Sequence, residues 1–478
     1  MFNTYRRGAA RFAAAGVTAG LLAAGVFAGA TTAAADGGNS GDSTATTTSG
    51  GATGKLGELA PGMYGGATVT DKSGKSAPEL AGLFQLKLDD GTSVYTYCID
   101  LYRGADTSGN AVYHEVPWSA TSLTQEGRDK DVAGKITWIL QHSFPTVNDL
   151  GALATTAGSG PLTKESAAAG TQVAIWRLSD DPKAAANDPA AEKLADYLDQ
   201  SAQAVAEPSP SLELTPPSVS GKSGGRIGPI TAHTSATGAQ AVLAADAPDG
   251  VKLVDGDGKP VTSVSDGSQL YFDVPAGTKE GSTSVTVSAT TSVPVGRAFA
   301  GTNSKNNGPS QTMILAGTSQ SEIQATATAT WADQGPIPAL SAQVNCSKSG
   351  VDVSASNKGD ESFTFTLEGK TYTIAPGESQ TITVPVAEDQ GYKIDIALPD
   401  KSVKTFKGVL DCKAATAPPT IPATNQPSPA SASDTGNLAE TGSSSATPMI
   451  AGIAVALVVV GGGAVFFFRR NARKNSAA

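Results

Sequence analysis

The sequence has little basic charge and few cysteines, and both shortages limit what the protein does. Its 34 lysines and arginines are outnumbered by 44 aspartates and glutamates, for a formal net charge of −10 at pH 7. Phosphate backbones are bound through a concentrated basic face, and this composition shows none. We therefore expect no nucleic-acid partner, and the modest acidic surface favours solubility.

The N-terminus has the composition of an export signal. Arg6, Arg7 and Arg11 precede an Ala/Gly-rich apolar run over 12–30, which gives way to small residues up to Ala35. This order of basic, apolar and small residues is typical of a cleaved signal peptide, predicted here over 1–35. The mature chain is thus predicted to be secreted.

The C-terminal end carries a second apolar run, over 448–468, followed by a basic tail over 469–478. The run is long enough for a transmembrane helix, and the positive-inside bias predicts a cytoplasmic tail. The upstream pentapeptide LAETG, at 438–442, resembles the sorting signal of sortase substrates in its actinobacterial form. The resemblance implies cleavage between Thr441 and Gly442 and attachment to the peptidoglycan cell wall, with sortase and peptidoglycan as partners. A plain membrane anchor is the alternative.

The 3 cysteines are Cys98, Cys346 and Cys412. Thiols of exported proteins normally pair, so one of the three must be left over. Cys346 and Cys412 flank a strand-rich segment, which suits a disulfide between the first and last strands of one small domain. Cys98 is then an unpaired thiol that requires an explanation.

Composition divides the mature chain into segments. Residues 36–54 have almost no apolar side chains, which predicts a disordered leader. Residues 55–206 contain most of the tryptophans and predict a mixed α+β domain. Helices are expected over 131–142, 163–178 and 190–206, and paired strands over 83–88 and 92–101.

Helical periodicity disappears after a proline-rich stretch that begins at Pro208. Two all-β domains, each expected to be an Ig-like sandwich, are predicted over 207–335 and 340–413, the second containing the disulfide. In the first of these domains, strands are expected over 269–274, 282–289, 311–316 and 322–331. In the second, they are expected over 362–367, 371–374, 380–384 and 392–397. Residues 414–437 are rich in Ala, Pro, Ser and Thr, which predicts an extended stalk.

Two short motifs in the first domain carry the functional hypothesis. One is Tyr97-Cys98-Ile99-Asp100, at the end of a predicted strand, and the other is Thr171-Gln172-Val173-Ala174-Ile175-Trp176, inside a predicted helix. Together they resemble the signatures of bacterial thioester domains, found in Gram-positive surface adhesins, over about 55–206. The resemblance implies a bond between the side chains of Cys98 and Gln172, supported by the motif residues Tyr97, Asp100, Thr171, Ala174 and Trp176.

The chemistry requires these two residue types. A Cys thiol that attacks a Gln carboxamide expels ammonia and leaves an activated acyl group, which an amine then captures as a stable amide. Ile175 and Trp176 share a helical face with Gln172 and help to exclude water from that bond. The predicted function is cell adhesion by covalent capture of an amine-bearing surface protein or a polyamine. The protein is expected to act once rather than as an enzyme, with no cofactor and no metal.

Two other interpretations remain open. Cys98 as the nucleophile of a transglutaminase- or peptidase-like enzyme would need His114 or His142 as its base, although no local signature of those families surrounds it. A passive wall-anchored stalk without reactive chemistry is the other. The Asp-Gly-Asp-Gly segment over 255–258 lacks the remaining ligands of a calcium loop and is expected to be a hairpin turn.

Overall fold

The computed structural model describes residues 42–46 and 50–413, apart from positions 72, 126, 181, 182, 307 and 318. Most of this part of the chain is β-structure, with few helices. No helix among these residues is both long enough and apolar enough to cross a membrane. The following predicted segments lie outside the described residues: the signal peptide over 1–35, the stalk over 414–437, the LAETG motif over 438–442, the apolar span over 448–468 and the basic tail over 469–478.

Six antiparallel strands form a closed ring, called the ring below. Their order is β3-β4-β16-β15-β5-β2, and β2 pairs again with β3 to close it. The strands are β2 (Thr53–Thr70), β3 (Ser76–Leu88), β4 (Ser93–Cys98), β5 (Ala111–Val116), β15 (Ala298–Asn303) and β16 (Pro309–Gly317). A short strand, β6 (Lys183–Ala186), pairs with the C-terminal end of β2. Closure gives every ring strand an inner and an outer face.

Side chains alternate between these two faces. Cys98, Tyr113 and Met313 belong to a hydrophobic cluster to which all six strands contribute from the inner face. Tyr97 and Ile99 belong to a second cluster, which joins the outer face to the helices. Because neighbours along a strand point to opposite faces, the side chains of Tyr97 and Cys98 lie on opposite faces of β4.

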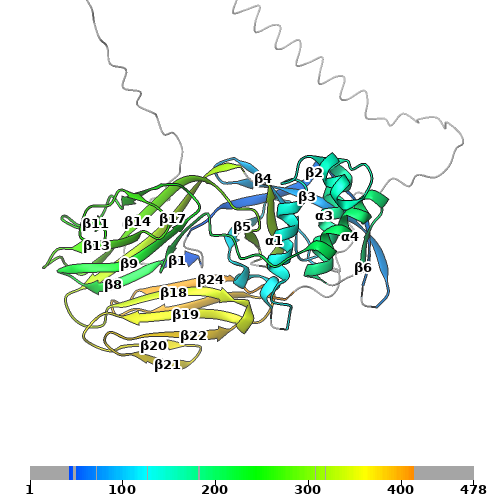
Figure 1. The fold of residues 1–478 in the computed structure, drawn as a ribbon. Helices are drawn as coiled ribbons and strands as arrows, with labels where there is room; N and C mark the ends of the chain where they lie inside the picture. The colour runs from blue at the N-terminus through cyan, green and yellow to red at the C-terminus, as the bar shows by residue number, and fades with distance from the viewer. Residues whose placement is uncertain are drawn as a thin grey trace, which may run out of the picture. The chain divides into compact units, whose positions relative to one another are not determined.

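The helices pack together over the outer face. They are α1 (Val132–His142), α2 (Leu150–Ala157), α3 (Lys164–Ser179) and α4 (Pro189–Ser201). Figure 1 shows α3 and α4 beside β2, β3 and β6. Three of the helices are at the expected positions, although the last ends at Ser201 rather than at 206. The short helix α2 has no counterpart among the sequence-based expectations.

The helix α3, which carries Gln172, is buried on nearly all sides. Its start is fixed by a capping box in which Thr163 and Ser166 bond reciprocally to each other's backbone N–H groups. Every residue from 166 to 176 is buried. At Gly170 an added Cβ would lie 2.4 Å from the carbonyl oxygen of Ala191 in α4. The absence of a side chain at Gly170 therefore sets the spacing between the two helices.

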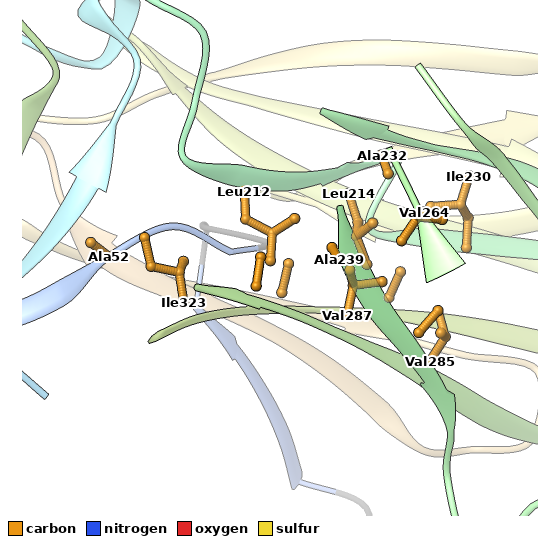
Figure 2. Packing of buried hydrophobic residues seen from close by; sticks show 14 of the residues in the cluster. Ala52, Leu212, Leu214, Ile230, Ala232, Ala239, Val264, Val285, Val287 and Ile323 are labelled. Carbon is orange, nitrogen blue, oxygen red and sulfur yellow. The ribbon is translucent and has the colours of Figure 1, made fainter. Parts of the chain in front are cut away.

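The second region consists of two sheets whose side chains share one core. The first has the order β12-β10-β14-β17-β8 and the second β11-β13-β9-β7. Their strands are β7 (Leu212–Thr215), β8 (Ser218–Lys222), β9 (Gly225–Thr234), β10 (Ala239–Leu243), β11 (Lys252–Val254), β12 (Ser263–Val264), β13 (Gln269–Val274), β14 (Gly281–Ser292) and β17 (Gln320–Ala332). Figure 2 shows Leu214 and Ile230 of one sheet near Val264, Val285 and Val287 of the other. This cluster is continuous with the inner face of the ring.

The predicted boundary between the first two domains is wrong in one respect. Residues 311–316 are expected in the second domain, but they form β16 of the ring. The chain leaves the second region after β14, forms the hairpin β15–β16 between β4 and β5, and returns as β17. All positions of β16 from 310 to 316 are buried, because both of its faces are covered. A strand that is buried on both faces does not reveal from its own sequence which sheet it joins.

The third region contains the predicted disulfide. Its strands are β18 (Pro338–Asn345), β19 (Gly350–Asn357), β20 (Phe363–Leu367), β21 (Lys370–Ile374), β22 (Ser379–Pro385), β23 (Gly391–Ala397) and β24 (Val403–Val409). They form the sheets β18-β19-β22, β20-β21 and β1-β24-β23. Cys346 and Cys412 are bonded to each other, 66 positions apart.

The expected disordered leader over 36–54 is wrong for part of its length. Residues Asp42–Thr46 form β1, which pairs in parallel with β24, and β2 already begins at Thr53. Ala52 is buried in the inner-face cluster. Backbone pairing with an exposed strand edge needs no apolar side chains, so composition is a poor guide to such a segment.

Candidate functional site

The first motif lies where β4 ends and the chain bends. Tyr97 is fully buried on the outer face and donates a hydrogen bond from its hydroxyl to the carbonyl oxygen of Phe144 at 2.8 Å. Thr171 of α3 hydrogen bonds with the same tyrosine side chain and donates to the carbonyl oxygen of Ala167 at 2.8 Å. Tyr97 and Thr171 therefore join β4 to the helix that carries the second motif.

The carboxamide of Gln172 lies against the peptide groups of Cys98. Its Oε1 accepts a hydrogen bond from the N–H of Cys98 at 3.0 Å, and its Nε2 donates to the carbonyl oxygen of Cys98 at 2.9 Å. Gln172 is fully buried and Cys98 is 4% exposed. The fold thus brings into contact two residues that are 74 positions apart in the chain.

The gap that Gln172 fills is created by the neighbouring strand. Pairing between β3 and β4 ends at Phe84 and Thr96. From Gly82 to Ser76, β3 is paired with β2 alone. The next peptide groups of β4, at Cys98, are left without a strand partner on that side. Buried peptide groups need a partner, and the primary amide of Gln172 supplies both a donor and an acceptor.

The thiol of Cys98 is in an environment that opposes ionisation. Burial raises the pKa of Cys98 above its usual range, and the negative charges of Asp100 and Asp180 raise it further. Hydrogen bonds from its own backbone and from the side chain of Gln311 act in the opposite direction. The thiol is therefore protonated at neutral pH, which makes it a poor thiolate nucleophile without local assistance.

Asp100 orders the bend that follows Cys98. Its Oδ1 accepts a hydrogen bond from the hydroxyl of Ser122 at 2.7 Å, and its Oδ2 accepts from the N–H of Thr312 at 3.2 Å. Its own carbonyl oxygen accepts from Nε2 of Gln311 at 2.8 Å. The sequence motif includes Asp100 without a role, and the structure gives it one: it connects the bend to β16.

Asp180 is a site residue that the sequence analysis missed. It caps the C-terminal end of α3, and its Oδ2 accepts hydrogen bonds from the N–H of Leu101 at 3.0 Å and from the hydroxyl of Ser179 at 2.7 Å. Burial raises the pKa of Asp180 to about 7, and the charge of Asp100 contributes to this rise. Its Oδ1 is buried without a hydrogen-bond partner in the described part of the chain. A helix-terminal Asp followed by a second Asp gives no sequence signal that would distinguish it from an ordinary cap.

The remaining motif residues pack around Gln172. Ala174 is fully buried and Trp176 is 3% exposed, both in the cluster between the ring and the helices. The indole N–H of Trp176 has no hydrogen-bond partner among the described residues. This apolar packing keeps solvent away from the contact between the two motifs.

The two histidines considered as catalytic bases have other partners. Nδ1 of His114 lies 3.3 Å from the hydroxyl of Thr53, and burial lowers the pKa of this imidazole. His114 is on β5, which β15 and β16 separate from β4. The ring of His142 stacks on Trp138 with centroids 4.0 Å apart, and its Nδ1 contacts the carbonyl oxygen of Trp138 at 2.8 Å. These contacts give no support to an enzyme in which His114 or His142 acts as the base for Cys98.

The segment over 255–258 is a turn, as expected. Oδ1 of Asp255 accepts hydrogen bonds from the N–H groups of Asp257 and Lys259, both at 2.9 Å. A different acidic group, Glu388 with Asp389 and Asp411, lies in the third region. The guanidinium of Arg103 is 2.6 Å from Asp389 and 2.8 Å from Asp411, so a side-chain cation already neutralises this group.

Residues 95–204 match the thioester domain family. The match contains both motifs, including Cys98 and Gln172, and it bears out the resemblance to thioester domains. It does not extend to β2, β3, β15 or β16, which complete the ring. No curated protein matches the sequence.

Two solved structures of thioester-domain proteins are similar to this chain. The Bacillus anthracis TIE protein is 14% identical, with a TM-score of 0.26, over 75% of this chain and 64% of that protein. The thioester domain of the Enterococcus faecium TIE86 protein is 17% identical, with a TM-score of 0.25, over 59% of this chain and 97% of that domain. The chain thus spans less than two thirds of the B. anthracis protein.

Proposed function

We propose that this chain is a wall-anchored surface adhesin that captures an amine-bearing target through a thioester between Cys98 and Gln172. The observation that carries the proposal is the paired hydrogen bonding of the Gln172 carboxamide with the N–H and carbonyl of Cys98. This contact holds the carboxamide at the residue that bears the thiol, inside a site from which water is largely excluded. Holding two reacting groups together in this way replaces a bimolecular encounter by an intramolecular step.

Formation of the bond balances without an external reagent. The sulfur of Cys98 attacks the carboxamide carbon of Gln172, a carbon–sulfur bond forms and the carbon–nitrogen bond breaks. The amide nitrogen leaves as ammonia and takes the thiol proton with it. Because burial and two carboxylates disfavour the free thiolate, we infer that a carboxylate near the bend receives the proton on the way. Asp180, with a pKa of about 7 and an unpartnered oxygen, fits that requirement.

Capture of the target consumes the thioester. The nitrogen of a primary amine attacks the acyl carbon of Gln172, the carbon–sulfur bond breaks and its electron pair stays on sulfur. The proton lost by the amine restores the thiol of Cys98, and an amide bond remains between target and adhesin. The protein is consumed in the reaction, so it is a single-turnover binder and not an enzyme.

The ends of the sequence complete the proposal. The predicted signal peptide exports the chain, and sortase cuts between Thr441 and Gly442 and joins Thr441 to peptidoglycan. The two β regions after the ring then act as spacers of the Ig-like sandwich type, and the segment over 414–437 acts as the stalk. The target is a lysine side chain of a surface protein, or a polyamine with the same nucleophile.

The decisive experiment is intact-mass analysis of the purified exported chain before and after incubation with methylamine. We expect the wild-type chain to lack one ammonia relative to its sequence, and to gain one methylamine on incubation. Cys98→Ala and Gln172→Ala should each show the full mass and no gain. Gln141→Ala, at an exposed position of α1, is the matched control and should behave like wild type.

A full mass for the wild-type chain would rule out the thioester and leave a passive surface protein or a cysteine enzyme. Anchoring is tested separately, by expression in a Gram-positive host that carries a sortase of matching specificity. Deletion of 438–442 should release the protein from the wall fraction into membrane and medium. Unchanged wall attachment of this variant would contradict the sorting assignment.

A further inference from the structure

The reaction site contains a second glutamine, which comes from outside the family match and from a distant part of the sequence. Gln311 lies on β16, the ring strand that pairs with β4. In that pairing Met313 is opposite Cys98, the last residue of β4, and Gln311 lies two positions before Met313 on β16. Residues two apart on a strand share a face, which makes Gln311 the diagonal neighbour of Cys98 on the inner face.

The contacts of Gln311 follow the chain just after the thiol. Its Nε2 donates to the carbonyl oxygen of Asp100 at 2.8 Å, and its backbone N–H donates to the carbonyl oxygen of Gly104 at 3.2 Å. The adjacent residue Thr312 accepts from the N–H of Ile99 at 3.1 Å. The Gln311 side chain lowers the pKa of the Cys98 thiol, and it is 5% exposed.

A primary amide nitrogen carries two hydrogens, and the carbonyl of Asp100 takes one of them. The second hydrogen is available to the sulfur. We propose that Gln311 is a residue of the reaction itself: it donates a hydrogen bond to the sulfur of Cys98 and stabilises the charge that sulfur carries as nucleophile and as leaving group. This inference rests on the proposed thioester and adds to it a third side chain.

The need for such a donor follows from the surroundings of the sulfur. When the amine attacks the acyl carbon of Gln172, the electron pair of the broken carbon–sulfur bond stays on sulfur until the proton arrives. Burial raises the pKa of the Cys98 thiol, and the negative charges of Asp100 and Asp180 raise it further. The two carboxylates disfavour negative charge there, and Gln311 is the side-chain hydrogen bond that acts in the opposite direction. Preorganised donors of this kind act where charge develops.

The test measures the rate of methylamine incorporation by the full exported chain, followed by intact mass. The probe variant is Gln311→Met, which keeps the length of the side chain and removes its donor. Because a hydrogen bond to a charged group is lost, we expect incorporation to slow roughly 10- to 100-fold. Ser310→Ala is the matched control, since it removes buried hydrogen bonds to Tyr113 and to the N–H of Asp106 from the same strand. It should react at close to the wild-type rate.

A second variant, Gln311→Glu, separates a donor role from a packing role. The protonated carboxyl donates to sulfur, whereas the carboxylate repels it. The ratio of its rate to the wild-type rate should therefore rise as the pH is lowered, while the ratio for Gln311→Met stays flat. Because each rate is divided by the wild-type rate at the same pH, titration of the amine and of Asp180 largely cancels.

The outcomes separate this inference from the proposed function. A wild-type chain of full mass contradicts the thioester and this inference with it. If wild type lacks one ammonia and Gln311→Met reacts at the wild-type rate, the role of Gln311 is refuted while the thioester stands. If Gln172→Ala still lacks one ammonia and Gln311→Met has the full mass, Gln311 is the acyl donor. The assignments of Gln172 as acyl donor and of Gln311 as hydrogen-bond donor are then both wrong. A folded Gln311→Met that forms no bond, with Gln172→Ala equally unreacted, supports the role of Gln311 in activating the sulfur.

Discussion

Cys98 and the pair Cys346–Cys412 show how the same residue type meets two different partners in one chain. In the third region the flanking strands bring two thiols together, and they form a disulfide in a small cluster with Leu410. In the ring, the carboxamide of Gln172 is hydrogen bonded to Cys98, and the negative charges of Asp100 and Asp180 raise the pKa of its thiol after burial has done so. The comparison teaches that a cysteine's chemistry is set by what the fold places beside it.

The two regions also differ in how they connect distant segments. The third region uses the disulfide, whereas the ring uses a buried ion pair. Glu115 of β5 accepts hydrogen bonds from Nε of Arg297 at 2.9 Å, from the N–H of Ser211 at 2.9 Å and from the N–H of Ala52 at 3.0 Å. Its side chain is 1% exposed and that of Arg297 is 5% exposed. One carboxylate therefore joins the start of β2, the start of the second region and the start of β15.

The first prediction breaks this ion pair. Arg297→Met leaves the carboxylate of Glu115 buried without a cation and should lower the free energy of unfolding by about 3–5 kcal/mol. Urea unfolding followed by tryptophan fluorescence measures the loss. The double variant Arg297→Met/Glu115→Gln is the control and should recover part of the stability. A single variant as stable as wild type would show that this contact does not hold the ring together.

The second prediction concerns the disulfide. Cys346→Ala/Cys412→Ala should destabilise the third region by roughly 4 kcal/mol, since the closed loop no longer restricts the unfolded chain. Thermal unfolding compared with wild type, with and without reductant, measures the effect. Methylamine incorporation at Gln172 should be unchanged. A loss of incorporation in this variant would mean that the two cysteine sites are not independent.

The third prediction uses the close approach of α3 and α4. Gly170→Ala places a methyl group against the backbone of Ala191 and should cost about 1–3 kcal/mol through overpacking. Because Gly170 is two residues before Gln172, the fraction of chains that lack one ammonia should also fall. Gly238→Ala, where an added Cβ meets nothing within 4 Å, is the control. Equal ammonia loss in both variants would show that helix spacing does not position Gln172.

The smallest effect is a pH dependence from Asp180. Between the ordinary value of 3.8 and about 7, the folded state keeps a proton on this carboxyl that the unfolded chain has lost. The folded state then binds more protons, so this group's contribution to stability decreases as the pH rises through that interval. We therefore expect the unfolding free energy of wild type to fall relative to that of Asp180→Asn as the pH rises from 3.8 to about 7. A constant difference would place the pKa of Asp180 in its ordinary range.

The sequence by itself predicted that Cys98 and Gln172 come together, the disulfide partners, and three of the four α-helices in the described residues, because each has a local signature. Cys98 and Gln172 stand in short motifs, Cys346 and Cys412 flank a strand-rich segment, and α1, α3 and α4 follow recognisable spacing. Only the tertiary structure decided that β16 belongs to the ring, because a strand buried on both faces has no local mark of its sheet. It also decided that Asp180 and Gln311 lie at the thiol. Both are ordinary residues in sequence, and they acquire a role through pairing and helix packing between segments far apart in the chain.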